Sequence, residues 1–260
     1  MTPPISIASS PDILLESGAY RVRLARDARD LDAVLRLRYE VFNLELGEGL
    51  EESHATGRDR DPFDAVCHHL LVLDAGGAVI GTYRAQTMEM ARASGRGFYT
   101  DGIFDLSLLP GSVLEESIEV GRACIARGHR NRRVLFLLWK GLAAYVVATG
   151  KPSLFGCCSL TSQDPAEGRR TLRHLRKEGH LHPVLTTRPR PGWECDLSGE
   201  DEGMTAEVVL PPLFQIYLRH GGKAVGSPAI DRQFKTIDFL VLLDTRTMPA
   251  DAHATFFGDR

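Results

Sequence analysis

The stretch from residue 115 to residue 150 constrains the fold more than any other part of this chain. β-branched residues recur within 118–125 and indicate a strand, and apolar residues recur at helical spacing from 134 to 147. A cationic loop with the sequence RGHRNRR lies between them at 127–133. The succession of strand, basic loop and long helix predicts an α/β fold with this strand at the centre of its sheet.

Two charged residues, Glu119 and Arg122, stand within this predicted strand. Residues three apart face opposite sides of a regular strand, but Gly121 lies between them and permits a bulge. A carboxylate inside a sheet is costly unless it has a partner or a task. Two interpretations stay open: Glu119 pairs with Arg122 or Arg84 for structural reasons, or it is a catalytic base beside a guanidinium.

The remaining elements predict a mixed sheet with helices on both faces. The hairpin expected at 67–87 argues against a purely parallel arrangement. We expect a flexible N-terminal extension at 1–18, one domain at 19–248 and a C-terminal tail at 249–260. The other predicted strands are 19–25, 153–160 and 237–243, and the helices are 31–42, 134–150, 164–177 and 211–218.

Composition excludes several classes of protein. The 260 residues carry a net charge of −3, which gives no overall field for nucleic acid. Five cysteines without metal-ligand spacing, and no secretion signal, indicate a reducing compartment and buried thiols. Adjacent histidines at 68 and 69 face opposite ways in a strand, so no metal site is expected. The chain lacks the ~20-residue apolar run of a membrane span, so any membrane contact would be peripheral.

Several segments together resemble the N-acyltransferases that make lyso-ornithine lipid, which are often labelled haemolysins. The resemblance covers residues 20–245 and implies a GNAT-like fold, with a mostly antiparallel central sheet, related to the acyl-homoserine-lactone synthases. The segments that carry it are Leu37–Phe42, Asp61–Val72, Gly81–Arg84, Glu119–Arg122, Leu154–Cys157, Gly226–Asp231 and Thr236–Leu240.

The resemblance implies a set of site residues. Glu119 is the candidate base, with Arg122 beside it; Asp61 and Asp64 would hold the ammonium groups of ornithine, and Arg84 or Arg122 its carboxylate. Alternatively, the two aspartates belong to a solvated loop. The implied substrate-binding residues are Arg38, Phe42, Asp61, Asp64 and Arg84.

The donor is expected to be an acyl carrier protein. The Q/R-x-x-G-x-G/A loop by which related acetyltransferases bind coenzyme A is absent, and RGHRNRR stands in its place. An acidic carrier protein presents one phosphate on its phosphopantetheine arm, which suits such a loop. No permanently bound cofactor is expected, and the implied carrier-binding residues are Arg127, Arg130, Arg132 and Arg133.

The expected activity is transfer of a fatty, 3-hydroxylated acyl chain from acyl carrier protein to the α-amine of ornithine. Alternatives are another acceptor such as glycine or tyrosine, a coenzyme-A-dependent acetyltransferase of small amines, or a non-enzymatic membrane-active protein. The expected location is the cytoplasm, with a peripheral contact to anionic membrane as a further option. The basic segment at 169–190 could be a solvated helix face or bind carrier protein or lipid headgroups.

Overall fold

The computed structural model describes residues 10–198 and 208–258, and a nine-stranded sheet runs through them. The strands are β1 (Leu14–Ser17), β2 (Tyr20–Leu24), β3 (His68–Leu73), β4 (Val79–Thr87), β5 (Ser117–Ile125), β6 (Ser153–Leu160), β7 (Lys223–Ala224), β8 (Ala229–Asp231) and β9 (Thr236–Asp244). Their order is β1-β2-β3-β4-β5-β6-β9-β7, with β8 also paired to β9. The β5–β6 pair is parallel and the other pairs are antiparallel. The predicted mixed, mostly antiparallel sheet is confirmed, and it is open.

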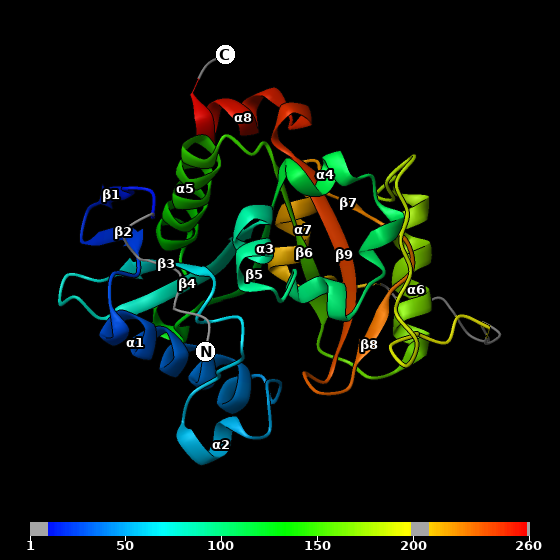
Figure 1. Ribbon diagram of the computed structural model, residues 1–260, viewed down its shortest axis with the longest axis horizontal. Helices are drawn as coiled ribbons and strands as arrows, with labels where there is room; N and C mark the ends of the chain where they lie inside the picture. Colours follow the sequence, from blue (N-terminus) through cyan, green and yellow to red (C-terminus); the bar gives the residue numbers. More distant parts are fainter. Residues whose placement is uncertain (1–9, 199–207, 259–260) are drawn as a thin grey trace.

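Helices cover both faces of this sheet (Figure 1). Leu70 and Val72 of β3 face α5, whereas Leu71 packs with Val34 of α1 on the opposite face. This alternation is what a buried strand requires, because successive side chains point to opposite faces. The helices are α1 (Ala28–Arg38), α2 (Ser53–Thr56), α3 (Met88–Ser94), α4 (Gly111–Glu115), α5 (Arg132–Thr149), α6 (Pro165–Lys177), α7 (Pro212–Arg219) and α8 (Ala250–Phe257). Shorter helical segments are the π-helix η2 (Tyr39–Glu45) and the 3₁₀ turns η3 (Tyr99–Gly102), η4 (Leu106–Leu108), η5 (Arg127–His129) and η6 (Thr245–Thr247).

Both ends of the chain are more ordered than the sequence predicted. Residues 14–17 of the expected flexible extension form β1, which pairs with β2, while residues 1–9 lie outside the described ranges. Most of the expected tail forms α8, which lies across the end of α5 in Figure 1. There Phe256 packs against Trp139 with ring centroids 5.7 Å apart. Both corrections have one reason, since the β1–β2 hairpin and α8 each pack against α5, which is distant in the sequence.

The parallel pair β5–β6 separates part of the way along its length. Its register runs from Ser117 opposite Ser153 to Glu119 opposite Phe155 and then stops. Gly156 marks the last close approach, since a Cβ atom placed there would lie 2.0 Å from the carbonyl oxygen of Val120. Beyond this point the β6-facing edge of β5 is unpaired, and the sheet divides like a fork.

A bulge in β5 explains how the side chains of Glu119 and Arg122 come to lie on the same face of the sheet. The β4–β5 register shifts so that Thr82 opposes Cys124 while Arg84 opposes Gly121, which leaves two β5 residues opposite Tyr83. The left-handed backbone conformation falls on Arg122 itself, at φ 50°, and Gly121 is not the residue that adopts it. As a consequence, both charged side chains contact Tyr99. The Glu119 carboxylate accepts a hydrogen bond from the Tyr99 backbone N–H, and the Arg122 guanidinium lies over the Tyr99 ring.

Candidate active site

A cavity of about 820 Å³ occupies the fork between β5 and β6. On the α5 and α7 side its wall is apolar and aromatic, because this face of the sheet belongs to the main core. On the α1 and α3 side its wall is charged and polar. The apolar wall includes Tyr83, Leu135, Leu138, Cys158, Phe214, Tyr217 and Val241. The polar wall includes Glu48, Arg84, Gln86, Thr100, Glu119, Arg122, Ser159, Asp231 and Asp238.

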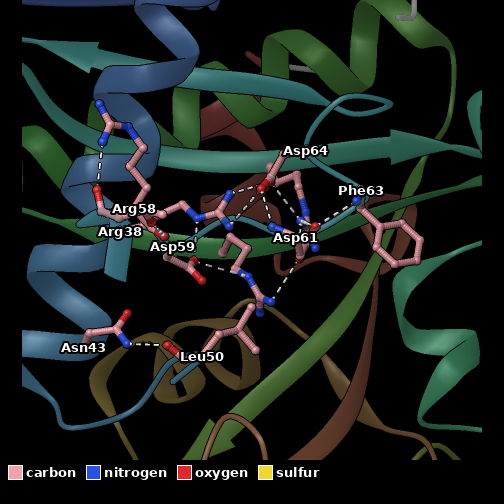
Figure 2. Close-up of polar contacts among 11 residues, drawn as sticks. Arg38, Asn43, Leu50, Arg58, Asp59, Asp61, Phe63 and Asp64 are labelled. Atoms are coloured by element: carbon pink, nitrogen blue, oxygen red, sulfur yellow. Dashed lines mark hydrogen bonds and ion pairs between the residues drawn. The ribbon is translucent and has the colours of Figure 1, made fainter. Parts of the chain in front are cut away.

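Six buried charged side chains form a closed ring behind the polar wall, with arginine and aspartate alternating (Figure 2). The ring runs through Arg38, Asp59, Arg122, Asp61, Arg84, Asp64 and back to Arg38. Its consecutive N···O distances lie between 2.6 and 3.6 Å. Because α1, β4 and β5 each give one arginine, the ring fastens the acidic loop that precedes β3 to three elements.

The ring argues against a solvated acidic loop. Asp61 and Asp64 are not solvated: burial alone would raise the pKa of each, but the neighbouring guanidiniums outweigh it and hold both pKa values below the ordinary range. Both oxygens of Asp64 already accept hydrogen bonds, from Arg38, Arg84 and the Asp61 N–H. Neither aspartate is among the residues that line the cavity, and Arg38 is not either.

Arg84 and Arg122 connect the ring to the cavity. Arg122 lies with its guanidinium carbon 3.9 Å from the ring centroid of Phe234 and 4.9 Å from that of Tyr99. Arg84 lies 5.3 Å from the Tyr99 centroid. Phe42, on η2, also lines the cavity and packs edge-on against Phe234. The two guanidiniums are therefore held between aspartates on one side and aromatic faces on the other.

Glu119 is 6% exposed and is held at both carboxylate oxygens. One oxygen accepts from the Thr100 N–H at 2.7 Å and the Thr100 hydroxyl at 2.6 Å, and the other accepts from the Tyr99 N–H at 2.9 Å. Burial raises the pKa of Glu119, and these hydrogen bonds oppose the rise. The side chain therefore anchors η3 and also borders the cavity.

Three further carboxylates line the far end of the polar wall. Asp238, on β9, is 3% exposed, and burial raises its pKa to about 6. Asp231 accepts two backbone N–H bonds at 2.8 Å, and Glu48 accepts from the Thr161 hydroxyl. None of the three ion-pairs with a lysine or arginine in the ranges 10–198 and 208–258. The sequence signal was present, because Asp231 and Asp238 stand in segments that carried the family resemblance.

The cationic loop lies at the mouth of the cavity, where α5 begins. Asn131 caps this helix by accepting from the N–H groups of residues 133 and 134. Arg130 and Arg132 line the cavity, and Arg130 also forms a two-point ion pair with Glu45 at 2.5 and 2.8 Å. Arg127 and Arg133 are exposed and do not line it. The structure thus places two of the four predicted arginines at the cavity.

Thiol chemistry is not supported at this site. Cys157 lines the cavity, but burial raises its pKa well above the ordinary value, so the thiol stays protonated. Across the described part of the chain, no three His, Cys, Asp or Glu side chains are arranged to hold a metal ion. Among the same residues, no helix combines the length and apolar character needed to cross a bilayer.

The fold places the protein in a known class. A family model described as an acetyltransferase (GNAT) domain matches residues 37–140. The solved structure of FeeM, an N-acyl amino acid synthase from uncultured soil microbes, matches with a TM-score of 0.51 at 13% identity, covering 88% of this chain and 94% of FeeM. The acyl-homoserine lactone synthase LasI matches with a TM-score of 0.50 at 13% identity, covering 92% and 95% of the two chains. At these identities the likeness concerns the fold, which is that of a GNAT acyltransferase.

The sequence relatives are more specific. An L-ornithine N(alpha)-acyltransferase of Rhodobacter capsulatus is 35% identical over 252 residues, covering 93% of this chain and 96% of its own length. The L-ornithine N(alpha)-acyltransferase of Rhizobium meliloti is 32% identical over 248 residues, covering 91% and 83%. The chain belongs to the L-ornithine N(alpha)-acyltransferase family. The predicted family resemblance and the prediction of an acyltransferase are confirmed.

Proposed function

We propose that this enzyme transfers a fatty, 3-hydroxylated acyl chain from acyl carrier protein to the α-amine of ornithine, which gives lyso-ornithine lipid. The observation that carries the proposal is the fork. It joins an apolar wall to a charged wall across an open strand edge, in one cavity of about 820 Å³. An acyl chain and a charged amino acid need these two environments, and their reacting atoms must meet where the two walls join.

The donor arm suits the open edge of β5. A phosphopantetheine arm carries amides that can pair with free backbone groups, as an added strand does at a sheet edge. Its phosphate would lie at the N-terminus of α5, where the positive end of the helix dipole, Arg130 and Arg132 favour an anion. The acyl chain would then extend along the apolar wall towards α7.

The chemistry requires one proton acceptor and donors for a developing oxyanion. The acceptor amine attacks the thioester carbonyl carbon, a C–N bond forms, and the C–S bond breaks. Glu119, directly or through water, takes the proton that the ammonium group must lose, and the leaving thiolate takes up a proton. Backbone N–H groups near Val120 and Arg122, at the fork, would face the thioester oxygen. The raised pKa of Glu119 suits this task.

The acidic end of the polar wall favours a dicationic acceptor. Glu48, Asp231 and Asp238 offer negative charge to a side-chain ammonium. Arg84 or Arg122 would receive the carboxylate. In this arrangement Asp61 and Asp64 do not touch the acceptor, because they hold these two arginines in place.

The product would be an amphiphile, so a peripheral contact with anionic membrane on the cytoplasmic side belongs to the same proposal. Exposed basic residues at the end of α6, such as Arg176 and Lys177, would provide it.

Incubating the purified chain with acyl carrier protein loaded with 3-hydroxyacyl chains, and with an equimolar mixture of ornithine, glycine and tyrosine, tests the proposal. Mass spectrometry is expected to find N-acylornithine as the main product, with acyl-coenzyme A a poorer donor. Preferred acylation of glycine would overturn the acceptor, and preferred use of acyl-coenzyme A would overturn the donor. No acylated amino acid from any donor would overturn the function.

A further inference from the structure

Gln86 is a buried polar residue for which the structure gives no internal partner. It lies on β4, is 1% exposed and lines the cavity. Neither its carbonyl oxygen nor its amide nitrogen forms a hydrogen bond with any residue of the described ranges. A buried amide with neither atom paired is costly to folding and rare in native proteins. Because Gln86 lines the cavity, a bound molecule there would be the nearest source of partners for its amide.

The neighbours of Gln86 are the residues that an amino acid acceptor needs. Gln86 stands directly opposite Glu119 in the β4–β5 register, so the two side chains lie next to each other on one face. Arg84 is two positions away on the same strand and points to the same face. All hydrogen bonds and ion pairs that the structure gives Arg84 use Nη1, which leaves Nε and Nη2 for a ligand.

Glu119 can still accept one more hydrogen bond. Its Oε2 accepts only from the Tyr99 N–H, whereas Oε1 accepts from both the N–H and the hydroxyl of Thr100. An amine held between Gln86 and Glu119 would have this oxygen as its proton acceptor.

We propose that Gln86 and Arg84 together bind the head group of an α-amino acid. The Gln86 carbonyl oxygen accepts from the α-amine, its amide N–H donates to the α-carboxylate, and the free nitrogens of Arg84 bind the same carboxylate. An amide offers a donor and an acceptor side by side, which matches the adjacent carboxylate and amine of a free amino acid. The inference rests on the proposed function and adds to it that the acceptor must carry an intact α-carboxylate.

The test compares the wild-type enzyme with Gln86→Met, which keeps the length of the side chain and removes both polar atoms. The KM for ornithine is expected to rise about ten- to hundredfold, while the KM for the acyl donor changes less than about threefold. The preference for ornithine over ornithinamide, which lacks the carboxylate, should fall by a similar factor. Gln215→Met is the matched control, because the Gln215 amide already donates to the Leu210 carbonyl and does not line the cavity.

A second readout does not depend on turnover. If the free amide is kept for substrate, Gln86→Met should leave the melting temperature of the ligand-free protein unchanged or raise it. The upward shift that ornithine causes should shrink in the same variant. A KM for ornithine within twofold of wild type, or an equal rise in the KM of the donor, would overturn the inference. Should Gln86→Met not fold, Gln86 is a structural residue and the inference also fails. A wild-type enzyme that acylates no free amino acid would instead refute the proposed function.

Discussion

Glu119 supports the local structure and is also the proposed base, and these two roles can be separated. Its carboxylate holds η3 through three hydrogen bonds, so its removal affects position as well as proton transfer. Thr100 supplies two of these bonds, one from its hydroxyl, and has no acid–base role. A comparison of variants at the two positions therefore distinguishes support of η3 from catalysis.

We expect Glu119→Gln to lower kcat by about 10²–10⁴, the range for loss of a general base. Thr100→Val, which removes one supporting hydroxyl, should lower kcat by less than about tenfold. Stopped assays of amide formation, with circular dichroism as a check on folding, measure both. Near-normal turnover of a folded Glu119→Gln protein, or equal losses in the two variants, would show that Glu119 only supports η3.

The buried charge of Asp238 should make the stability of the protein depend on pH. Burial raises its pKa to about 6 in the folded chain, against an ordinary value of 3.8. The folded state therefore binds this proton more tightly than the unfolded state, and the group destabilises the fold progressively as pH rises from about 4 to about 6. Above that range, the difference between the folded and unfolded pKa values of Asp238 corresponds to about 3 kcal/mol of lost stability.

We expect Asp238→Asn to raise the free energy of unfolding of the ligand-free protein above pH 6, with little change near pH 4. The same variant should raise the KM for ornithine at pH 7.5 about tenfold, because a side-chain ammonium loses its counterion. Denaturant unfolding at several pH values and acceptor kinetics measure the two effects. If Asp238→Asn is less stable than the wild type at pH 7.5 and its KM for ornithine is unchanged, Asp238 has a purely structural role.

At the scale of elements, the fork depends on Gly156. It is the residue at which β6 passes closest to β5 before the pair separates, and its missing side chain allows this approach. Loss of pairing beyond this point leaves a strand edge inside the protein, which would be unfavourable if no partner used it.

Gly156→Ala is expected to destabilise the protein by roughly 1–3 kcal/mol, because its Cβ would meet backbone at 2.0 Å and a strand would have to move. The kcat/KM for the acyl donor should fall by more than the loss of folded protein explains, since the displaced edge is where the acyl donor is proposed to bind. Gly102→Ala is the control, because a Cβ there meets nothing within 4 Å. Thermal unfolding and donor kinetics test this, and an active, unchanged Gly156→Ala enzyme would contradict the proposed role of the fork.

At the scale of the whole molecule, a chain with a net charge of −3 concentrates positive charge at two separate places. One is the mouth of the cavity at the start of α5, and the other is the basic end of α6, on the opposite side of the view in Figure 1. An acidic carrier protein should be attracted to the first, because its arm is proposed to enter the fork there. Such steering between exposed charges weakens with salt.

Charge reversal distinguishes the two places. Arg130→Glu combined with Arg132→Glu should raise the KM for acyl carrier protein about tenfold at low salt and flatten its dependence on salt. Arg176→Glu combined with Lys177→Glu, on α6, should leave both unchanged. Kinetics over a salt series measure the effect. If the α6 variant shows the loss instead, the carrier protein docks at the basic segment 169–190.

The sequence by itself predicted six of the nine strands in the described ranges, the main helices and, through the family resemblance, the class of enzyme. Period-two and helical patterns are local, and they located β3 to β6 and α5 because each buries one regular face. Charged residues in an otherwise apolar strand also pointed to Glu119 and Arg122, and the family resemblance pointed to Arg84. What the sequence could not show was how these charges pair, since Arg38 and Asp59 lie 21 positions apart and become neighbours only through the fold.

Only the tertiary structure decided which side chains face the cavity. Asp61 and Asp64, which were predicted to meet the substrate, contact arginines in the fold. Gln86 drew no prediction, although the period of its strand placed it on the same face as Arg84. Whether such a residue finds a hydrogen-bond partner depends on elements that come from elsewhere in the chain. The ordering of β1 and α8 depends on such long-range contacts as well. Local patterns determine which face of an element is buried, but long-range contacts determine what that face meets.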